Sequence, residues 1–280
     1  MPAELTNIFS SDVVWALAQA GGAIVLCLAV MLVCRRFSVH VERETVISLV
    51  RGLVQIAVVG LVLAVLLHGN LLVGGLILLA MMAAAAVIAS RRAQGIKDAL
   101  LISFYSIAAG SGVVIAGMAA IGVLTAEIAT LVPVGSMIIA NAMNSCAQSM
   151  ERFRADVTSH VGQVEAGLAL GADPAVTVAP YVQGAVYASL IPRLDSLKSL
   201  GIVWIPGVMA GMIVSGVNPI YAGIYQFIVI AMIFAASGIT ALAVTLLIRT
   251  RAFSPAEQLV LRPGPPRKVA PVPGNARQAR

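Results

Sequence analysis

The chain has 280 residues, of which 60% are apolar and 11% are charged, and its mean hydropathy is +0.98. This composition excludes an ordinary soluble domain and predicts an integral membrane protein. The net charge of +6 comes from basic residues placed between apolar runs, so we interpret it as a topology signal and expect no nucleic-acid partner.

Seven apolar runs are each long enough to cross a hydrocarbon core of about 30 Å as a helix. They are Val13 to Cys34, Val46 to Leu67, Leu71 to Ala89, Ala99 to Gly122, Ile128 to Met150, Leu200 to Val217 and Ile220 to Ile248. With the amino terminus outside, all 18 Lys and Arg residues fall on the cytoplasmic side, in accord with the positive-inside rule. We predict an all-α, multi-pass protein of the plasma (inner) membrane, with about seven transmembrane helices and cytoplasmic coupling helices between spans five and six.

The first two runs carry few polar residues. No basic region precedes the first run, which continues to Arg35 and Arg36, so we expect a retained span and not a signal peptide. In the second run, Arg51 and Gln55 are four residues apart and therefore share a helix face. We expect Arg51 to reach the cytoplasmic surface or the coupling region, and Gln55 to bond another helix or line a path.

Span five carries three amide side chains on one face, because Asn141, Asn144 and Gln148 recur at spacings of three and four. A polar face on a membrane helix either lines a cavity or bonds to another helix, and the residues leave both interpretations open. Met137 and Met143 offer soft sulfur donors to a metal in transit. Gap filling is the more ordinary role of methionine.

A polar cytoplasmic segment follows span five, whose helix is expected to continue past the membrane. A short helix then ends near Gly171, a residue suited to the left-handed conformation found after helices. Asp173 before Pro174 is typical of an N-cap followed by a first-turn proline, so a second short helix starts there. The apolar stretch from Ala175 to Ile191 is interrupted by a proline and a glycine, and we place it at the inner membrane surface.

Span six contains Pro206 and Gly207, which remove a backbone donor and loosen the helix, and these residues predict a mobile helix near a path. Residues 254–280 include six prolines and several arginines, and they predict a disordered basic tail that rests on anionic lipid. The chain is thus divided into a permease domain, 1–253, with a coupling region at about 151–198, and a tail, 254–280.

The cytoplasmic segment resembles the coupling loop of ABC transporter permeases, in which two short helices dock into the ATPase subunit. Its residues are Glu165-Ala166-Gly167-Leu168-Ala169-Leu170-Gly171-Ala172. A longer ordered series is similar to the FetB-type iron-export permease family, which also includes plant permeases linked to aluminium tolerance. That series comprises Arg51, Gln55, Gly60, residues 134–137 and 141–143, Leu190-Ile191-Pro192, Leu194-Asp195-Ser196, Lys198, Gly201, residues 205–211, Gly216, Pro219, Ala222 and Tyr225-Gln226. Three residues depart from the family pattern: Ala140, Tyr187 and Arg193.

The resemblance implies the membrane subunit of an ABC transporter, a homodimer that works with two copies of a separate ATPase and exports iron or another metal ion. The implied ATPase-coupling residues are Glu165, Ala166, Leu170, Gly171 and Ala172. None of the three lysines follows a glycine, so the chain has no Gly-x-x-x-x-Gly-Lys phosphate loop. We therefore expect no enzymatic activity from this chain alone and no cofactor bound to it, with ATP and Mg²⁺ held by the partner.

Candidates for the translocation path come from four parts of the chain. They are Gln55, Met137, Asn141, Met143, Asn144, Gln148, Pro206, Gly207, Met209 and Gln226, and no metal ligand is assigned among them. The groups expected in mid-membrane are neutral, so a proton-driven carrier with a buried carboxylate and histidine cluster is not predicted. The alternative function is an ATP-independent channel or secondary carrier for a small solute that uses the polar face of span five.

Overall fold

The computed structural model describes residues 11–37, 42–66, 71–93, 95–124 and 127–261, and within these ranges the chain is helical and contains no β-strand. The helices are α2 (Ser11–Arg36), α3 (Glu42–Leu66), α4 (Leu71–Ser90), α5 (Ala99–Ala120), α6 (Ile128–Ser159), α7 (Val161–Ala169), α8 (Pro174–Thr177), α9 (Ala179–Ser199), α10 (Gly207–Val214) and α11 (Pro219–Arg251). By length and composition, α2, α4, α5, α6 and α11 can cross a membrane, and α3 holds a shorter apolar stretch, Thr45–Gly60. The predicted all-α membrane class is confirmed.

Helices α2 and α3 form a unit of their own and are described by themselves. Most of their described side chains are exposed, including the large apolar side chains of Val25, Leu26 and Leu32. A helix that is apolar on all sides faces lipid or other membrane helices. Arg51 and Gln55 are both exposed on α3, and the assignment of Gln55 to a path stays a prediction.

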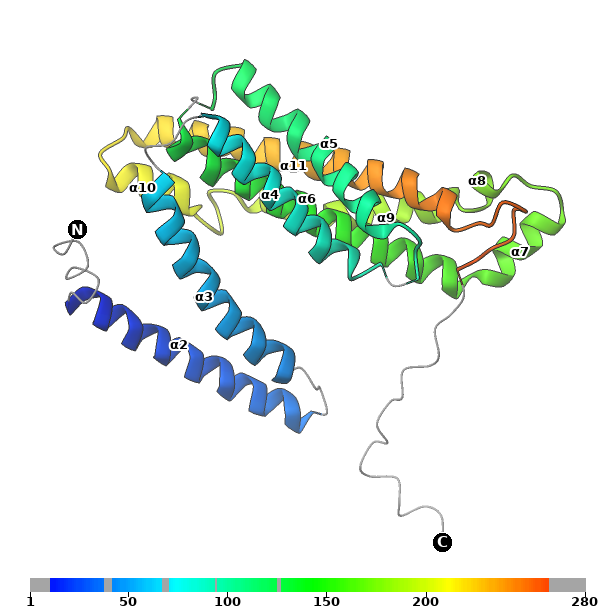
Figure 1. Cartoon of the computed structure of the whole chain (residues 1–280), viewed down its shortest axis with the longest axis horizontal. Helices are drawn as coiled ribbons and strands as arrows, with labels where there is room; N and C mark the ends of the chain where they lie inside the picture. Colours follow the sequence, from blue (N-terminus) through cyan, green and yellow to red (C-terminus); the bar gives the residue numbers. More distant parts are fainter. Residues whose placement is uncertain (1–10, 38–41, 67–70, 94, 125–126, 262–280) are drawn as a thin grey trace, which may run out of the picture. The chain divides into compact units, whose positions relative to one another are not determined.

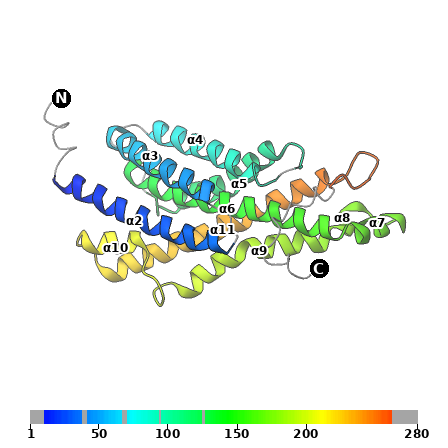
Figure 2. The ribbon, with the colours of Figure 1, turned by 90° about the horizontal axis from the view of Figure 1, so that it is seen from below.

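The second unit is a bundle in which α4, α5, α6, α9 and α11 run side by side (Figures 1 and 2). Helix α11 is central, because it packs against α5, α6 and α9. Its buried face combines apolar residues such as Val229 and Val244 with the hydroxyl side chains of Ser237 and Thr240. Helices α7 and α8 lie at one end of the bundle and α10 lies at the other.

The closest approach of α5 to α11 occurs at Gly110. A Cβ atom at this position would overlap Thr240 Oγ1 and would lie 2.7 Å from the carbonyl oxygen of Ala236. We expect Gly110→Val to lower stability by roughly 1–3 kcal/mol, because α11 must move away to accommodate the side chain. The melting temperature of the purified protein in lipid discs measures this loss. Gly112→Val is the matched control on the same helix, since nothing lies within 4 Å of its Cβ position; an equal loss in both variants would contradict the explanation.

The predicted sixth span, Leu200 to Val217, is not a single helix. Residues 200–206 form turns and extended chain, and the helix that follows, α10, has only 8 residues. Pro206 has extended backbone angles (φ −66°, ψ 145°) and precedes α10, so it does not lie inside a loosened helix as we predicted. The physical reason is that proline lacks an amide donor and disfavours helix in the residue before it.

The stretch from Ala175 to Ile191 is also more regular than predicted. Most of it belongs to α9, a 21-residue helix with Pro180 in its first turn and Pro192 in its interior. A proline in the first turn costs a helix no hydrogen bond, which is why Pro180 does not break it. Helix α9 packs along α6 and α11 and is therefore part of the bundle.

The tail begins later than predicted, because residues 254–261 fold back on the end of α11. The amide of Ser254 donates to the carbonyl of Gln258, and the amide of Val260 donates to that of Ala252, both at 2.8 Å. Leu259 and Leu261 are 4% exposed, and the free energy gained by burying them offsets the entropic cost of ordering this turn. The predicted disorder of residues 262–280 lies outside the described part of the chain.

Candidate functional site

The first candidate site is the reversal between α7 and α8. The chain turns through Leu170 and Gly171, and Gly171 has a φ of +83°, which glycine adopts without strain. Asp173 then caps α8, its Oδ1 accepting the amide of Ala175 at 2.7 Å, and Pro174 occupies the first turn. The predicted end of one short helix and start of another are confirmed.

The residues assigned to ATPase coupling lie together and are solvent-exposed. They are Glu165 and Ala166 on α7 and Leu170, Gly171 and Ala172 in the reversal. Leu170 is 89% exposed, and Val176 on the neighbouring α8 is 66% exposed. Exposed apolar side chains rimmed by polar ones are typical of a surface that contacts another protein.

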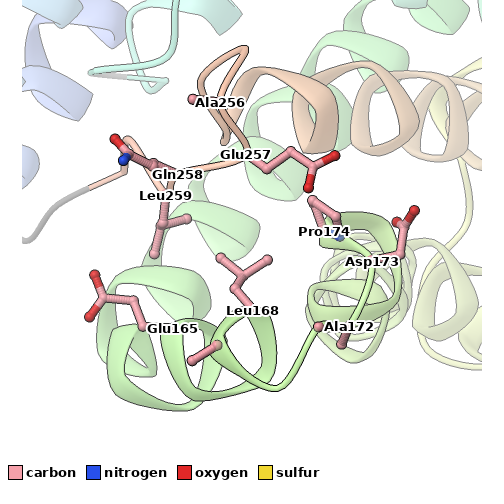
Figure 3. Close-up of a pocket in the computed structure, with 11 residues that line it drawn as sticks. Glu165, Leu168, Ala172, Asp173, Pro174, Ala256, Glu257, Gln258 and Leu259 are labelled. Carbon is pink, nitrogen blue, oxygen red and sulfur yellow. The ribbon is translucent and has the colours of Figure 1, made fainter.

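A cavity of about 850 Å³ lies between this reversal and the turn of residues 256–259 (Figure 3). Leu168 points from α7 into the cavity, and Glu257 extends its carboxylate towards Pro174. Glu165 and Asp173 also line the cavity, so three carboxylates surround it on a chain whose net charge is +6. Such a surface suits a partner with basic side chains.

Contacts join α7 to the bundle on two sides. The ring of His160, between α6 and α7, stacks on that of Tyr181 of α9 with centroids 5.3 Å apart. Tyr181 also donates its hydroxyl proton to Gln163 Oε1 of α7 at 3.1 Å. On the other side, a Cβ at Gly167 would lie 2.9 Å from Thr177 Cγ2, so α7 and α8 are in close contact. A force on the reversal is therefore transmitted to both α6 and α9.

The second candidate site is a row of three cavities along α6. The first, about 410 Å³, is lined by α6 residues from Thr130 to Met137 together with α10 and α11. The second, about 110 Å³, shares Met137 and adds Asn141. The third, about 470 Å³, is lined by Gln148 and the α6 residues that follow it, with Pro192 and its neighbours on α9. The row thus follows α6 from its first turns to its polar end.

Two of the three amides predicted on one face of span five line these cavities, Asn141 the second and Gln148 the third, whereas Asn144 lines none of the three. Asn141 is half-buried, and its Nδ2 donates to the carbonyl of Met137 at 2.7 Å, a bond within α6. Asn144 and Gln148 are exposed. Both alternatives that the sequence left open, a cavity-lining face and a face bonded to another helix, therefore stay predictions, as does a role in transport.

Arg193 lies in this site, although it was not among the predicted path residues. We assigned it to the cytoplasmic side, and it lines the 110 Å³ cavity together with Met137, Asn141, Ser196 and Trp204. At 1.5 Å per residue, Asn141 lies about 20 Å along α6 from its first residue and about 15 Å before Glu151, which pairs with Arg92 at the polar end of the bundle. A charged group therefore lies at the level of Asn141 within the bundle, while the expectation that only neutral groups occur at mid-membrane stays a prediction.

The remaining path candidates do not line these three cavities. Met143 is half-buried and packs against the core, the gap-filling alternative. Met209 packs on α11 beside Gly223, and Pro206 and Gly207 form the start of α10. Gln226 is 1% exposed inside the bundle, with no hydrogen-bond partner for either amide atom. Their part in a path stays a prediction.

Two ion pairs lie where α4, α5, α6 and α11 meet at the α7 end of the bundle, and a third joins Asp195 to Lys198 on α9 at 3.9 Å. Arg92 pairs with Glu151 at 3.1 Å, and Arg251 pairs with Asp98 at 3.4 Å. Pairs this exposed contribute little to stability. Among the described residues, no group of three or more His, Cys, Asp or Glu side chains could hold a metal ion.

Comparison with known proteins gives three informative relatives. The protein Aluminum Sensitive 3 of Arabidopsis thaliana is 29% identical over 90% of this chain and 94% of its own length. UPF0014 membrane protein STAR2 of rice, Oryza sativa subsp. japonica, is 32% identical over 78% of this chain and 77% of its own length. The probable iron export permease protein FetB of Escherichia coli is 28% identical over 85% of this chain and 93% of its own length.

No solved structure matches the chain. The sequence model of UPF0014, described as an uncharacterised protein family, matches residues 17–253, which include both candidate sites except for the turn after α11. The chain therefore belongs to the UPF0014 family.

Proposed function

We propose that this chain is the membrane-spanning permease subunit of an ABC transporter, and that it exports iron or another metal ion with ATP hydrolysed by a separate ATPase. The observation that carries the proposal is the reversal between α7 and α8, which presents Leu170 beside Glu165 at the polar end of the bundle. The relative named as a probable iron export permease supports the substrate class.

The mechanism follows from the continuity of α6. This helix has 32 residues, lines all three cavities and leads directly into α7 through His160. ATP binding would close two ATPase subunits and move the α7–α8 reversal that docks on them. Because α7 contacts both α6 and α9 through His160, Gln163 and Tyr181, the movement would change the separation of the two helices that flank the 110 Å³ and 470 Å³ cavities.

The assembly that we propose is a homodimer in the plasma (inner) membrane with two ATPase subunits, which hold ATP and Mg²⁺. Gly207 and Gly211 of α10 support pairing with a further helix, since nothing within 4 Å occupies the Cβ position at either glycine. Small residues four apart on a membrane helix permit close packing of a second helix. Contacts with membrane lipids would cover the rest of the exposed apolar surface.

The test is co-purification, in lipid discs, with an ABC ATPase subunit from the same genome, followed by ATP hydrolysis with and without iron. We expect a stable complex whose hydrolysis rises when iron is added. A complex whose ATP hydrolysis does not respond to iron would support the assignment as a permease and contradict iron as its substrate. Failure of the two chains to associate would contradict the proposal and favour a channel or secondary carrier.

A further inference from the structure

Arg193 is a positive charge inside the apolar bundle, at the level of Asn141, and it forms no ion pair with a described residue. Asp195, two residues further on, pairs instead with Lys198 at 3.9 Å. Its side chain is half-buried, and Nε is fully buried without a hydrogen-bond acceptor. No carboxylate lines its cavity, whose other polar residues are Asn141, Ser196 and Trp204. Charged residues inside a membrane are expensive, and they mark pathways, relays or ligand counter-ions.

The cavity beside Arg193 offers hydrogen-bond donors to an anion, and no described carboxylate lines it that would bind the guanidinium instead. A guanidinium carries five N–H donors and cannot be deprotonated in proteins. Asn141 and Ser196 donate to backbone carbonyls of their own helices and carry no charge, so they add polarity without neutralising the guanidinium. A volume of about 110 Å³ is that of a few water molecules at roughly 30 Å³ each, enough for one carboxylate or phosphate group.

We propose that Arg193 is an anion-binding residue on the transport path, and that the transported substrate carries a negatively charged group when it reaches the 110 Å³ cavity. The proposal rests on the proposed function, because it takes the row of cavities along α6 as the path. A guanidinium in a low-dielectric site repels a bare metal cation and attracts a carboxylate or phosphate. Exported metal would then cross as a complex with such a ligand, and a free organic anion is the other source of the same chemistry.

The local charge can be tested without knowledge of the passenger. In the full chain with Cys27, Cys34 and Cys146 replaced by alanine, Ser196→Cys places a thiol in the cavity. We expect the anionic sulfonatoethyl methanethiosulfonate to react faster than the cationic trimethylammonium-ethyl reagent. Adding Arg193→Gln should lower this preference at least tenfold, since focused charge changes local ion concentrations on that scale. Arg251→Gln is the matched control, because it removes an equal charge from an exposed ion pair with Asp98.

Two outcomes of the labelling would overturn the proposal. Equal preference with and without Arg193 would mean that the guanidinium does not set the local charge of the cavity. No reaction with either reagent would mean that water-borne solutes do not reach the cavity. Neither outcome bears on whether the chain binds an ATPase, so the permease proposal is tested separately by co-purification.

The passenger itself is tested on the complex in lipid discs, by ATP hydrolysis with ferrous iron alone, citrate alone or ferric citrate. We expect ferric citrate or citrate to stimulate, with a half-saturating concentration at least tenfold higher in Arg193→Gln and unchanged in Arg251→Gln. Stimulation by ferric citrate alone would identify an anionic metal complex, and stimulation by citrate alone would identify a free anion. Stimulation by ferrous iron alone, or no response to either anion in a complex that hydrolyses ATP, would overturn the inference.

Discussion

Leu170→Asp is expected to abolish productive docking of the ATPase, with a loss of affinity of at least about 100-fold, or roughly 2.7 kcal/mol. Leu170 is 89% exposed in the reversal that follows α7, and Glu165 of α7 and Val176 of α8 are also exposed. An apolar side chain packed at the centre of an interface is removed from water, and an unpaired charge buried in its place costs more than simple truncation. Titration of the ATPase onto the permease in lipid discs measures the change in Kd.

The controls separate docking from folding. Because Leu170 contacts little of its own chain, Leu170→Asp should leave the melting temperature of the isolated permease unchanged. Leu170→Met keeps an apolar side chain of similar size, so it should bind the ATPase as the unmodified chain does. An unchanged Kd for Leu170→Asp would remove this reversal from the docking surface.

Local signals in the sequence predicted the coupling reversal well. Gly171 and the Asp173-Pro174 pair act through their own backbone angles and hydrogen bonds, so the helix end and the N-cap follow from neighbouring residues alone. Continuous apolar runs also predicted α4, α5 and α11 to within three residues at each end. These elements need no knowledge of which helix packs against which.

The position of Arg193 could not be predicted in the same way. Its depth depends on α9 continuing through Pro192 and packing along α6, a tertiary contact that overrides the usual effect of an interior proline. A count of positive charges in loops treats any arginine near a helix end as cytoplasmic. The available signal was the apolar sequence Leu190-Ile191 just before Arg193, which is unusual for a solvated loop.

The contribution of residues 256–259 to the coupling cavity was missed for a related reason. Composition assigned everything after Ser254 to a tail, yet Leu259 and Leu261 provide enough apolar surface to hold a turn against the bundle. Composition averaged over 27 residues hides two leucines at one end of the segment. Apolar residues directly after a helix are a better guide to the true boundary than the average is.

Met137→Trp is expected to block the path while leaving the ATPase complex intact. Met137 is the residue shared by the 410 Å³ and 110 Å³ cavities, so a bulkier ring at this position occupies the junction between them. We expect iron efflux from proteoliposomes loaded with ferric citrate to fall at least tenfold, about 1.4 kcal/mol in apparent activation free energy. Co-purification of the ATPase should not change, because Met137 lies far along α6 from the α7–α8 reversal.

Met137→Leu is the matched variant, since it conserves volume and should keep both cavities open and efflux near that of the unmodified chain. The comparison also separates steric block from loss of sulfur. If both variants lose efflux equally, the thioether itself contacts the passenger, as expected for a soft donor to a metal. If neither variant loses efflux, the passenger does not cross between these two cavities, and the path must lie on another face of α6.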